Sequence, residues 1–171
     1  LQAIQRDNVH WISLPDSVTG LSTAAMESLQ DELSVLILPT NGQTVTFEMG
    51  CFDSYDKLTI ACYSDAQEAA AQALAAAAPN RIRVRRVTVR DDGYSYLKTD
   101  YMKTEFADTD ALSEDTAGSI LLLSVPSGIT EFDGTIPMGA GQEALPVTVI
   151  GDGVFEDSIA LQWVILPETT K

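Results

Sequence analysis

The stretch Arg81–Phe106 constrains the fold of this chain more than any other part of the sequence. In its first half apolar and polar residues alternate, which is the period-two pattern of a half-buried strand. The alternation slips by one residue at Arg85-Arg86, and we interpret this slip as a bulge that keeps the valines on one face. Asp92-Gly93 suits a tight turn, because glycine readily adopts positive φ angles, and Tyr94–Phe106 is rich in strand-favouring residues. The stretch therefore predicts one long central hairpin.

This predicted hairpin carries most of the positive charge of an acidic chain. It holds seven of the ten basic residues, whereas the whole chain has 25 acidic residues and a net charge of −15. A positive patch on one copy can face a negative patch on its neighbour, so the asymmetry favours head-to-tail self-association. The alternative is a solvated strand face whose arginines are balanced by nearby carboxylates. Strong acidity also argues against a protein that reads nucleic-acid sequence, because such a protein needs a dominant basic surface.

The length and composition are those of a globular chain with a substantial core. At 171 residues, 45% of them hydrophobic, one domain or one domain with an arm is expected. No apolar stretch is long enough to span a membrane, and the first residues lack the pattern of a signal peptide. Cys51 and Cys62 are the only cysteines, and we expect both to be small buried residues, with a single disulfide as the alternative.

The best helix in the chain is predicted at residues 64–78. Ser64 is a favourable N-cap, and Gln67 stands where a capping box requires it. The alanine-rich segment that follows has a high helix propensity and ends at Pro79-Asn80. Because its neighbours are nearly all alanine, we expect Leu74 to be the main apolar contact of this helix with the sheet.

Strands account for most of the remaining elements. Asn41-Gly42 predicts a second hairpin, between strands at 34–38 and 44–49. Ser119–Val125 is the most apolar strand and is expected at the centre of the sheet. Further strands are expected at residues 11–14, 57–63, 146–150 and 158–166. Together these elements predict a mainly β protein of the α+β class, a sandwich or barrel with one α-helix packed on it.

No arrangement of residues predicts an active site or a cofactor. His10 is the only histidine, and no serine or cysteine lies in the setting of an activated nucleophile. Asp152, Glu156 and Asp157 are carboxylates that suit calcium, but their spacing is not that of a calcium-binding loop. A solvated acidic turn is the simpler interpretation. We therefore expect no enzyme activity, no cofactor and no metal site.

The order of elements in the middle of the chain resembles a known protein family. The strand segments TVTFEMG and KLTIACY precede the helix DAQEAAAQALAAAA and the basic strand RIRVRRVTV. The Asp92-Gly93 turn, a long return strand, an acidic loop and the apolar strand ILLLSVPSG follow. Over Gly42–Gly128 this succession resembles the tail tube proteins of long-tailed phages and related gene-transfer particles. The resemblance lies in the order and character of the elements and not in a diagnostic motif.

The resemblance implies a β-sandwich flanked by one helix in residues 1–128, with residues 129–171 as a C-terminal β extension packed on the same domain. It implies a virion structural protein, assembled in the host cytoplasm, whose partners are copies of itself and other tail or head–tail proteins. In that family hexameric rings stack into a tube, and DNA passes through it without specific binding. The second hypothesis is another particle protein, namely a tail terminator, a connector, or a capsid cement or decoration protein. The third is a ligand-binding β-sandwich in which Trp11 and Trp163 form a sugar-stacking platform.

A tube that conducts DNA also implies a place for the arginines of the hairpin. Phosphate groups bind clustered cations strongly, so the arginines should not line the channel. We expect most of them to lie at subunit or ring interfaces and to pair with carboxylates of neighbouring copies. Such pairing predicts that added salt weakens assembly. The residues concerned are Arg81, Arg83, Arg85, Arg86 and Arg90, with Asp108, Asp110, Glu114 and Asp115 as the leading partners.

Overall fold

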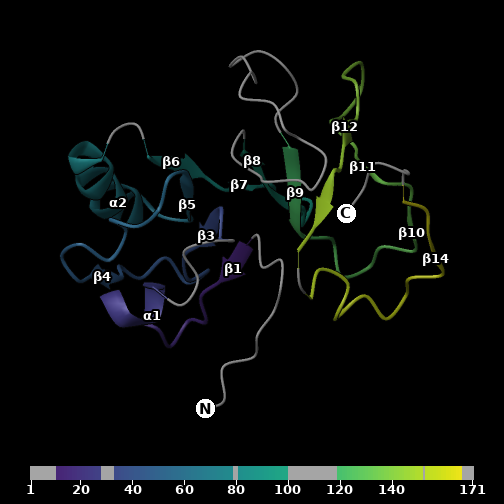
Figure 1. Cartoon of the computed structure of the whole chain (residues 1–171). Helices are drawn as coiled ribbons and strands as arrows, with labels where there is room; N and C mark the ends of the chain where they lie inside the picture. The colour runs from purple at the N-terminus through teal and green to yellow at the C-terminus, as the bar shows by residue number, and fades with distance from the viewer. Residues whose placement is uncertain (1–10, 28–32, 79–80, 100–118, 152, 167–171) are drawn as a thin grey trace. The chain divides into compact units, whose positions relative to one another are not determined.

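The chain forms many short strands and two helices in the part that the computed structural model describes, residues 11–27, 33–78, 81–99, 119–151 and 153–166 (Figure 1). This confirms a mainly β protein with one packed helix. The described residues fall into two compact units: those up to Arg86 form unit 1, and those from Val87 onward form unit 2. This division does not coincide with the expected one into residues 1–128 and 129–171.

Unit 1 is built around a four-stranded parallel sheet. Its two middle strands are entirely buried, as a parallel sheet with both faces covered requires. The short apolar runs WIS, VLI and LTIAC supply three of the strands. The strand order is β1 (Trp11–Ser13), β3 (Val35–Ile37), β5 (Leu58–Cys62) and β6 (Ile82–Arg86), and each pair of neighbours is parallel.

Helix α2 (Asp65–Ala77) connects β5 to β6, which is the crossover that two adjacent parallel strands need. Its capping box is confirmed: Ser64 accepts a hydrogen bond from the Gln67 N–H, and the Gln67 side chain accepts one from the Ser64 N–H. Ala71 is fully buried, whereas Leu74 is only half-buried, so the helix approaches the sheet mainly through a small side chain. The predicted stop at Pro79-Asn80 lies outside the described residues.

The predicted hairpin around Asn41-Gly42 is wrong. The strand before it, β3, is flanked by β1 on one side and β5 on the other, so no edge of β3 remains for a hairpin partner. The strand after it, β4 (Thr46–Phe47), instead pairs in parallel with β2 (Gly20–Leu21), which precedes the short helix α1 (Thr23–Glu27). Gly42 does adopt a positive φ of 76°, but it turns a loop and not a hairpin.

The long central hairpin is also wrong. Strand β6 pairs in parallel with β5 in unit 1, and the chain enters unit 2 at Val87. Only β7 (Thr88–Val89) and β8 (Ser95–Thr99) form an antiparallel hairpin, whose loop contains Gly93 with a φ of 95°. The slip at Arg85-Arg86 therefore marks the end of β6 and not a bulge; an irregular register occurs instead between Ser95 and Tyr96 in β8. The turn that Asp92-Gly93 favours therefore forms, but it joins only the short strands β7 and β8.

Unit 2 contains a four-stranded sheet in which β9 (Ser119–Ser124) is an inner strand, as predicted for the most apolar segment. The order is β13-β9-β8-β7, with β9 antiparallel to β8 and parallel to β13. Two small two-stranded sheets complete the unit. The remaining strands are β10 (Glu131–Phe132) paired with β14 (Trp163–Val164), β11 (Thr135–Ile136) paired with β12 (Leu145–Pro146), and β13 (Val149–Ile150).

Residues on both sides of position 128 share the core of unit 2. Tyr96 and Leu122 from the four-stranded sheet belong to the same buried cluster as Phe132, Ile136 and Val147. Segments from the expected C-terminal extension therefore pack on the strands that precede them.

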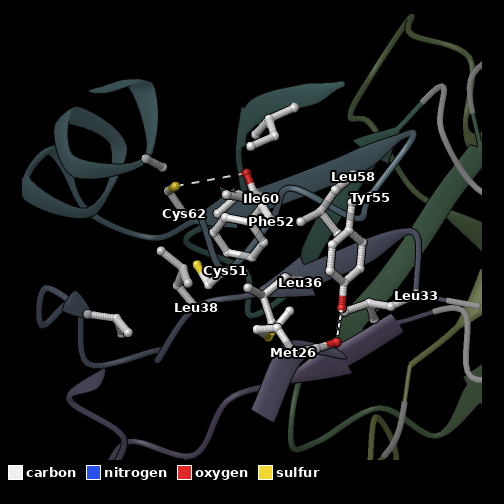
Figure 2. Packing of buried hydrophobic residues seen from close by; sticks show 13 residues of the cluster. Met26, Leu33, Leu36, Leu38, Cys51, Phe52, Tyr55, Leu58, Ile60 and Cys62 are labelled. Atoms are coloured by element: carbon white, nitrogen blue, oxygen red, sulfur yellow. Dashed lines mark hydrogen bonds between the residues drawn. The ribbon is translucent and has the colours of Figure 1, made fainter. Parts of the chain in front are cut away.

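The core of unit 1 contains both cysteines (Figure 2). Cys51 and Cys62 are buried free thiols, and the Cys62 thiol faces the carbonyl of Ile60 at 3.9 Å. In the same cluster the Tyr55 hydroxyl donates to the carbonyl of Met26 at 2.7 Å. Burial raises the pKa of Cys51 to about 11 and that of Cys62 to about 12. The expectation of two small buried residues is confirmed.

These pKa values predict the behaviour of the thiols in solution. We expect a thiol reagent at pH 8 to label the folded chain very slowly and to label two sites after denaturation, because the thiolate is the reactive form. Above pH 9 the unfolded thiols ionise and the folded ones do not, so the free energy of unfolding should fall as pH rises from 9 towards 11. The double variant Cys51→Ala/Cys62→Ala, as control, should lose this part of the pH dependence. Rapid stoichiometric labelling of the folded chain would contradict the burial.

Candidate interaction surfaces

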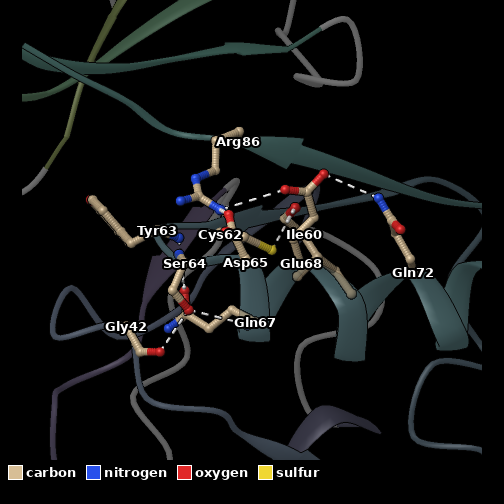
Figure 3. A network of polar contacts seen from close by, with 10 residues as sticks. All are labelled: Gly42, Ile60, Cys62, Tyr63, Ser64, Asp65, Gln67, Glu68, Gln72 and Arg86. Atoms are coloured by element: carbon tan, nitrogen blue, oxygen red, sulfur yellow. Dashed lines mark hydrogen bonds and ion pairs between the residues drawn. The ribbon is translucent and has the colours of Figure 1, made fainter.

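Many α/β proteins bind ligands at the carboxyl-terminal edge of their parallel sheet. In this chain, side-chain hydrogen bonds join the loops at that edge to one another. The side chain of Gln67, which is fully buried and lies beside Ser64 in Figure 3, makes four of them. Its Nε2 donates to the carbonyls of Pro39 at 2.8 Å and Gln43 at 3.0 Å. Its Oε1 accepts from the N–H groups of Tyr63 at 2.7 Å and Ser64 at 3.3 Å. One side chain thus joins the loop after β3 to the start of α2.

The loop after β1 is fastened to the same place. Asp16 Oδ1 accepts hydrogen bonds from the Thr40 hydroxyl at 3.1 Å and from the N–H of Asn41 at 3.3 Å. The carbonyl of Asp16 accepts from Gln43 Nε2 at 2.6 Å. In addition, the strand order follows the chain without reversal, so the sheet has no switch point that would open a crevice. We conclude that this edge is a structural clamp and not a ligand site.

The contacts of three arginines singled out in the sequence, Arg81, Arg86 and Arg90, can be followed in detail. Arg86 Nη1 lies 3.0 Å from Asp65 Oδ1 and 3.5 Å from Glu68 Oε2, both on α2 (Figure 3). Arg81 donates to the carbonyl of Asp53. These contacts are intramolecular, whereas the sequence led us to expect partners on neighbouring copies.

Arg90 is the third of these arginines. Its Nε donates to Asp92 Oδ1 at 3.0 Å, and its guanidinium carbon lies 6.0 Å from the centre of the Tyr94 ring. This hydrogen bond holds the pKa of the Asp92 carboxyl below its ordinary value. The ion pair lies within the β7–β8 hairpin. An alternative from the sequence is that nearby carboxylates balance the arginines, and this holds for Arg86 and Arg90.

Arg83 and Arg85 lie on β6, which is one of the two edge strands of the parallel sheet in the described part of the chain. Side chains alternate along a strand, so these two point to the face opposite Arg86 and hence away from α2. Arg85 is exposed and Arg83 is half-buried. The proposed partners Asp108, Asp110, Glu114 and Asp115 lie outside the described residues.

A second surface, which we did not predict, is apolar and belongs to unit 2. Seven large apolar side chains among the described residues are exposed, and five of them lie within eight consecutive residues. We call Ser158–Leu166, nine residues that include these eight, the β14 segment. The five exposed side chains are Ile159, Trp163, Val164, Ile165 and Leu166, with exposed fractions of 98%, 39%, 38%, 60% and 47%. The sequence carried a signal: WVIL is an unbroken apolar run, not the alternation of a half-buried strand.

The two tryptophans of the suggested sugar platform belong to different units. Trp11 lies in β1, is half-buried, and has an indole N–H that is buried without a hydrogen-bond partner in the described part of the chain. Trp163 lies in β14 and is partly exposed.

One open hollow of about 400 Å³ lies at the loop of the β7–β8 hairpin, where Arg90 and Asp92 line it and pair with each other. The groove between β2, β4 and α1 has a volume of about 490 Å³ and is wide open, and Leu21 and Phe47 line it. Its carboxylate, Glu48, accepts a hydrogen bond from the N–H of Thr23 at 2.7 Å and thereby caps α1. Within the described ranges, no group of three or more His, Cys, Asp or Glu side chains is placed to hold a metal ion. None of the helices described is long and apolar enough to cross a membrane.

Comparison with known proteins gives no match: no family model, no curated protein and no solved structure is similar to this chain.

Proposed function

We propose that this chain is a self-assembling structural subunit of a virion, and that its assembly is the tail tube, made of stacked hexameric rings. Two features support the proposal. One is the resemblance of the element order over Gly42–Gly128 to tail tube proteins. The other is the contrast between the basic strand β6 and the net charge of −15.

The observation that carries the proposal is the basic edge strand β6 in an acidic chain. An edge strand presents backbone N–H and C=O groups on which another strand can pair. Here it also carries Arg83 and Arg85 on one face, in a chain of net charge −15. Two copies repel each other over most of their surface, so the basic strand is the place where a neighbour is attracted.

A contact of this kind is head-to-tail, because a basic surface on one copy meets an acidic surface on the next. Head-to-tail contacts close into rings when the rotation between neighbours is suitable. The remaining acidic surface repels phosphate groups, which allows DNA to pass a ring without binding.

The double variant Arg83→Glu/Arg85→Glu tests the proposal. It makes the net charge more negative by four units, and we expect it to abolish rings and tubes in negative-stain images while the circular dichroism spectrum stays that of the folded chain. The matched control is Lys57→Glu/Lys98→Glu, which changes the charge equally at two other exposed positions and should still assemble. Assembly of the wild-type chain should weaken with added salt.

Other outcomes would contradict the proposal. Equal assembly of the two double variants would show that β6 is not the contact, and a wild-type chain without rings or tubes at high concentration would exclude a tube subunit. Well-defined trimers in the images would favour another particle protein, such as a capsid cement or decoration protein.

A further inference from the structure

The β14 segment is the most apolar exposed surface of the described chain, and it lies on an open strand. Among the described strands, β14 pairs only with β10, in a two-stranded parallel sheet, through hydrogen bonds such as that from the Ile165 N–H to the carbonyl of Phe132 at 2.8 Å. The four consecutive residues from Trp163 to Leu166 are all exposed. Because side chains alternate along a strand, both faces of the segment are uncovered. A soluble protein seldom leaves such a strand without a partner.

The charge distribution indicates which partner this is. The nine residues of the β14 segment carry no charged side chain, although one fifth of the chain is charged. In a chain of net charge −15, a partner copy meets repulsion at most places, but not along this strand. An uncharged strand can pair with an identical copy of itself without placing like charges opposite each other.

Two of the other edge strands, β6 and β7, suit a second copy less well. Two β6 strands would place Arg83 and Arg85 of one copy against the same arginines of the other. The edge strand β7 runs directly into Arg90 and Asp91 at the hairpin tip. Among these edges, β14 combines neutrality with exposed apolar side chains.

We propose that the β14 segment pairs with the β14 segment of a second copy of this chain, antiparallel and about a two-fold axis, and forms a dimer. The contact is isologous, since the same surface serves both copies. It would cover Trp163 and the apolar residues that follow it. The inference stands on the exposed strand alone and does not depend on the tail tube assignment, because ring formation was assigned to β6.

The variant Ile165→Lys tests this dimer in the full-length chain. Ile165 is 60% exposed, so lysine fits there without disturbing a core, but two copies would then place charges together in the interface. By sedimentation equilibrium in the Arg83→Glu/Arg85→Glu background, where rings are expected to be lost, we expect the chain to approach twice its mass of 18.4 kDa as concentration rises. The dissociation constant of the dimer should be at least tenfold higher in the Ile165→Lys variant than in the chain without this replacement. The matched control is Met49→Lys, which makes the same change at a side chain 96% exposed in unit 1 and should dimerise like wild type.

The effect of salt and the behaviour of the Arg83→Glu/Arg85→Glu variant distinguish the β14 dimer from ring formation. Added salt should strengthen the β14 dimer, because it screens the repulsion between two acidic chains and leaves the apolar contact intact. The dimer should also persist in the Arg83→Glu/Arg85→Glu variant, in which rings are expected to be lost. A wild-type chain that remains at 18.4 kDa throughout would overturn the inference, as would equal association of Ile165→Lys and Met49→Lys.

Discussion

Replacement of Gln67 by alanine is expected to lower the free energy of unfolding by about 2–4 kcal/mol. The reason is the number of partners that lose a hydrogen bond: two N–H groups and two carbonyls, of which the carbonyl of Pro39 is buried. A buried polar group left without a partner costs about 1–3 kcal/mol. Alanine has the higher helix propensity, so the loss comes from the missing hydrogen bonds, including that of the capping box, and not from helix propensity. Chemical denaturation followed by circular dichroism measures it.

Two further variants isolate the hydrogen bonds of Gln67. Gln67→Met keeps much of the side-chain volume and removes all four bonds, so it should lose nearly as much stability as alanine. Gln72→Ala is the control on the same helix, where the side chain is exposed and bonded only to Glu68 at 3.1 Å, and it should change the free energy by less than about 0.5 kcal/mol. A methionine variant as stable as wild type would mean that the bonds of Gln67 contribute little.

Replacement of Phe132 by alanine should have the largest effect on unit 2, a loss of about 3–5 kcal/mol in the free energy of unfolding. Phe132 is 1% exposed, and its ring meets that of Phe155 edge-to-face, with centroids 5.5 Å apart. No neighbouring side chain can fill the space without moving out of a packed cluster. The strand β10 that carries Phe132 also holds β14, so the N–H of Ile165 should exchange with solvent faster in the variant.

The control for Phe132 is Val89→Ala. Val89 belongs to unit 2 and is 65% exposed, so this truncation should change the stability by less than about 0.5 kcal/mol. A loss below 1 kcal/mol for Phe132→Ala, measured in the same denaturant titration, would show that this core is loosely packed.

Local features of the sequence predicted local structure well. The capping box of α2 needs only Ser64 and Gln67, three residues apart, and both hydrogen bonds form. The positive φ at Gly93 follows from the absence of a side chain, and the β7–β8 hairpin forms around it. The apolar run at β9 predicted an inner strand of a sheet, because no polar side chain in it needs solvent.

The partners of strands could not be predicted in the same way. The alternating pattern of Ile82–Arg86 fits a strand in either direction and beside any neighbour. Pairing with β5 follows from the crossover through α2, and this pairing removed β6 from the expected long hairpin. The same limit explains the failed hairpin at Asn41-Gly42, where β1 and β5 occupy both edges of β3.

Some features of the candidate surfaces likewise follow from the sequence, and others follow only from the tertiary structure. By itself, the sequence determined the excess of acidic residues, the basic strand and the neutral, unbroken apolar run at Trp163–Leu166, because these depend only on composition and order. Only the tertiary structure decided that Arg86 pairs with α2, that Gln67 closes the carboxyl-terminal edge of the sheet, and that β6 and β14 remain at sheet edges. The reason is that an ion pair, a buried hydrogen bond or an open edge is a relation between segments far apart in the chain. Such relations arise only when the whole fold brings those segments together.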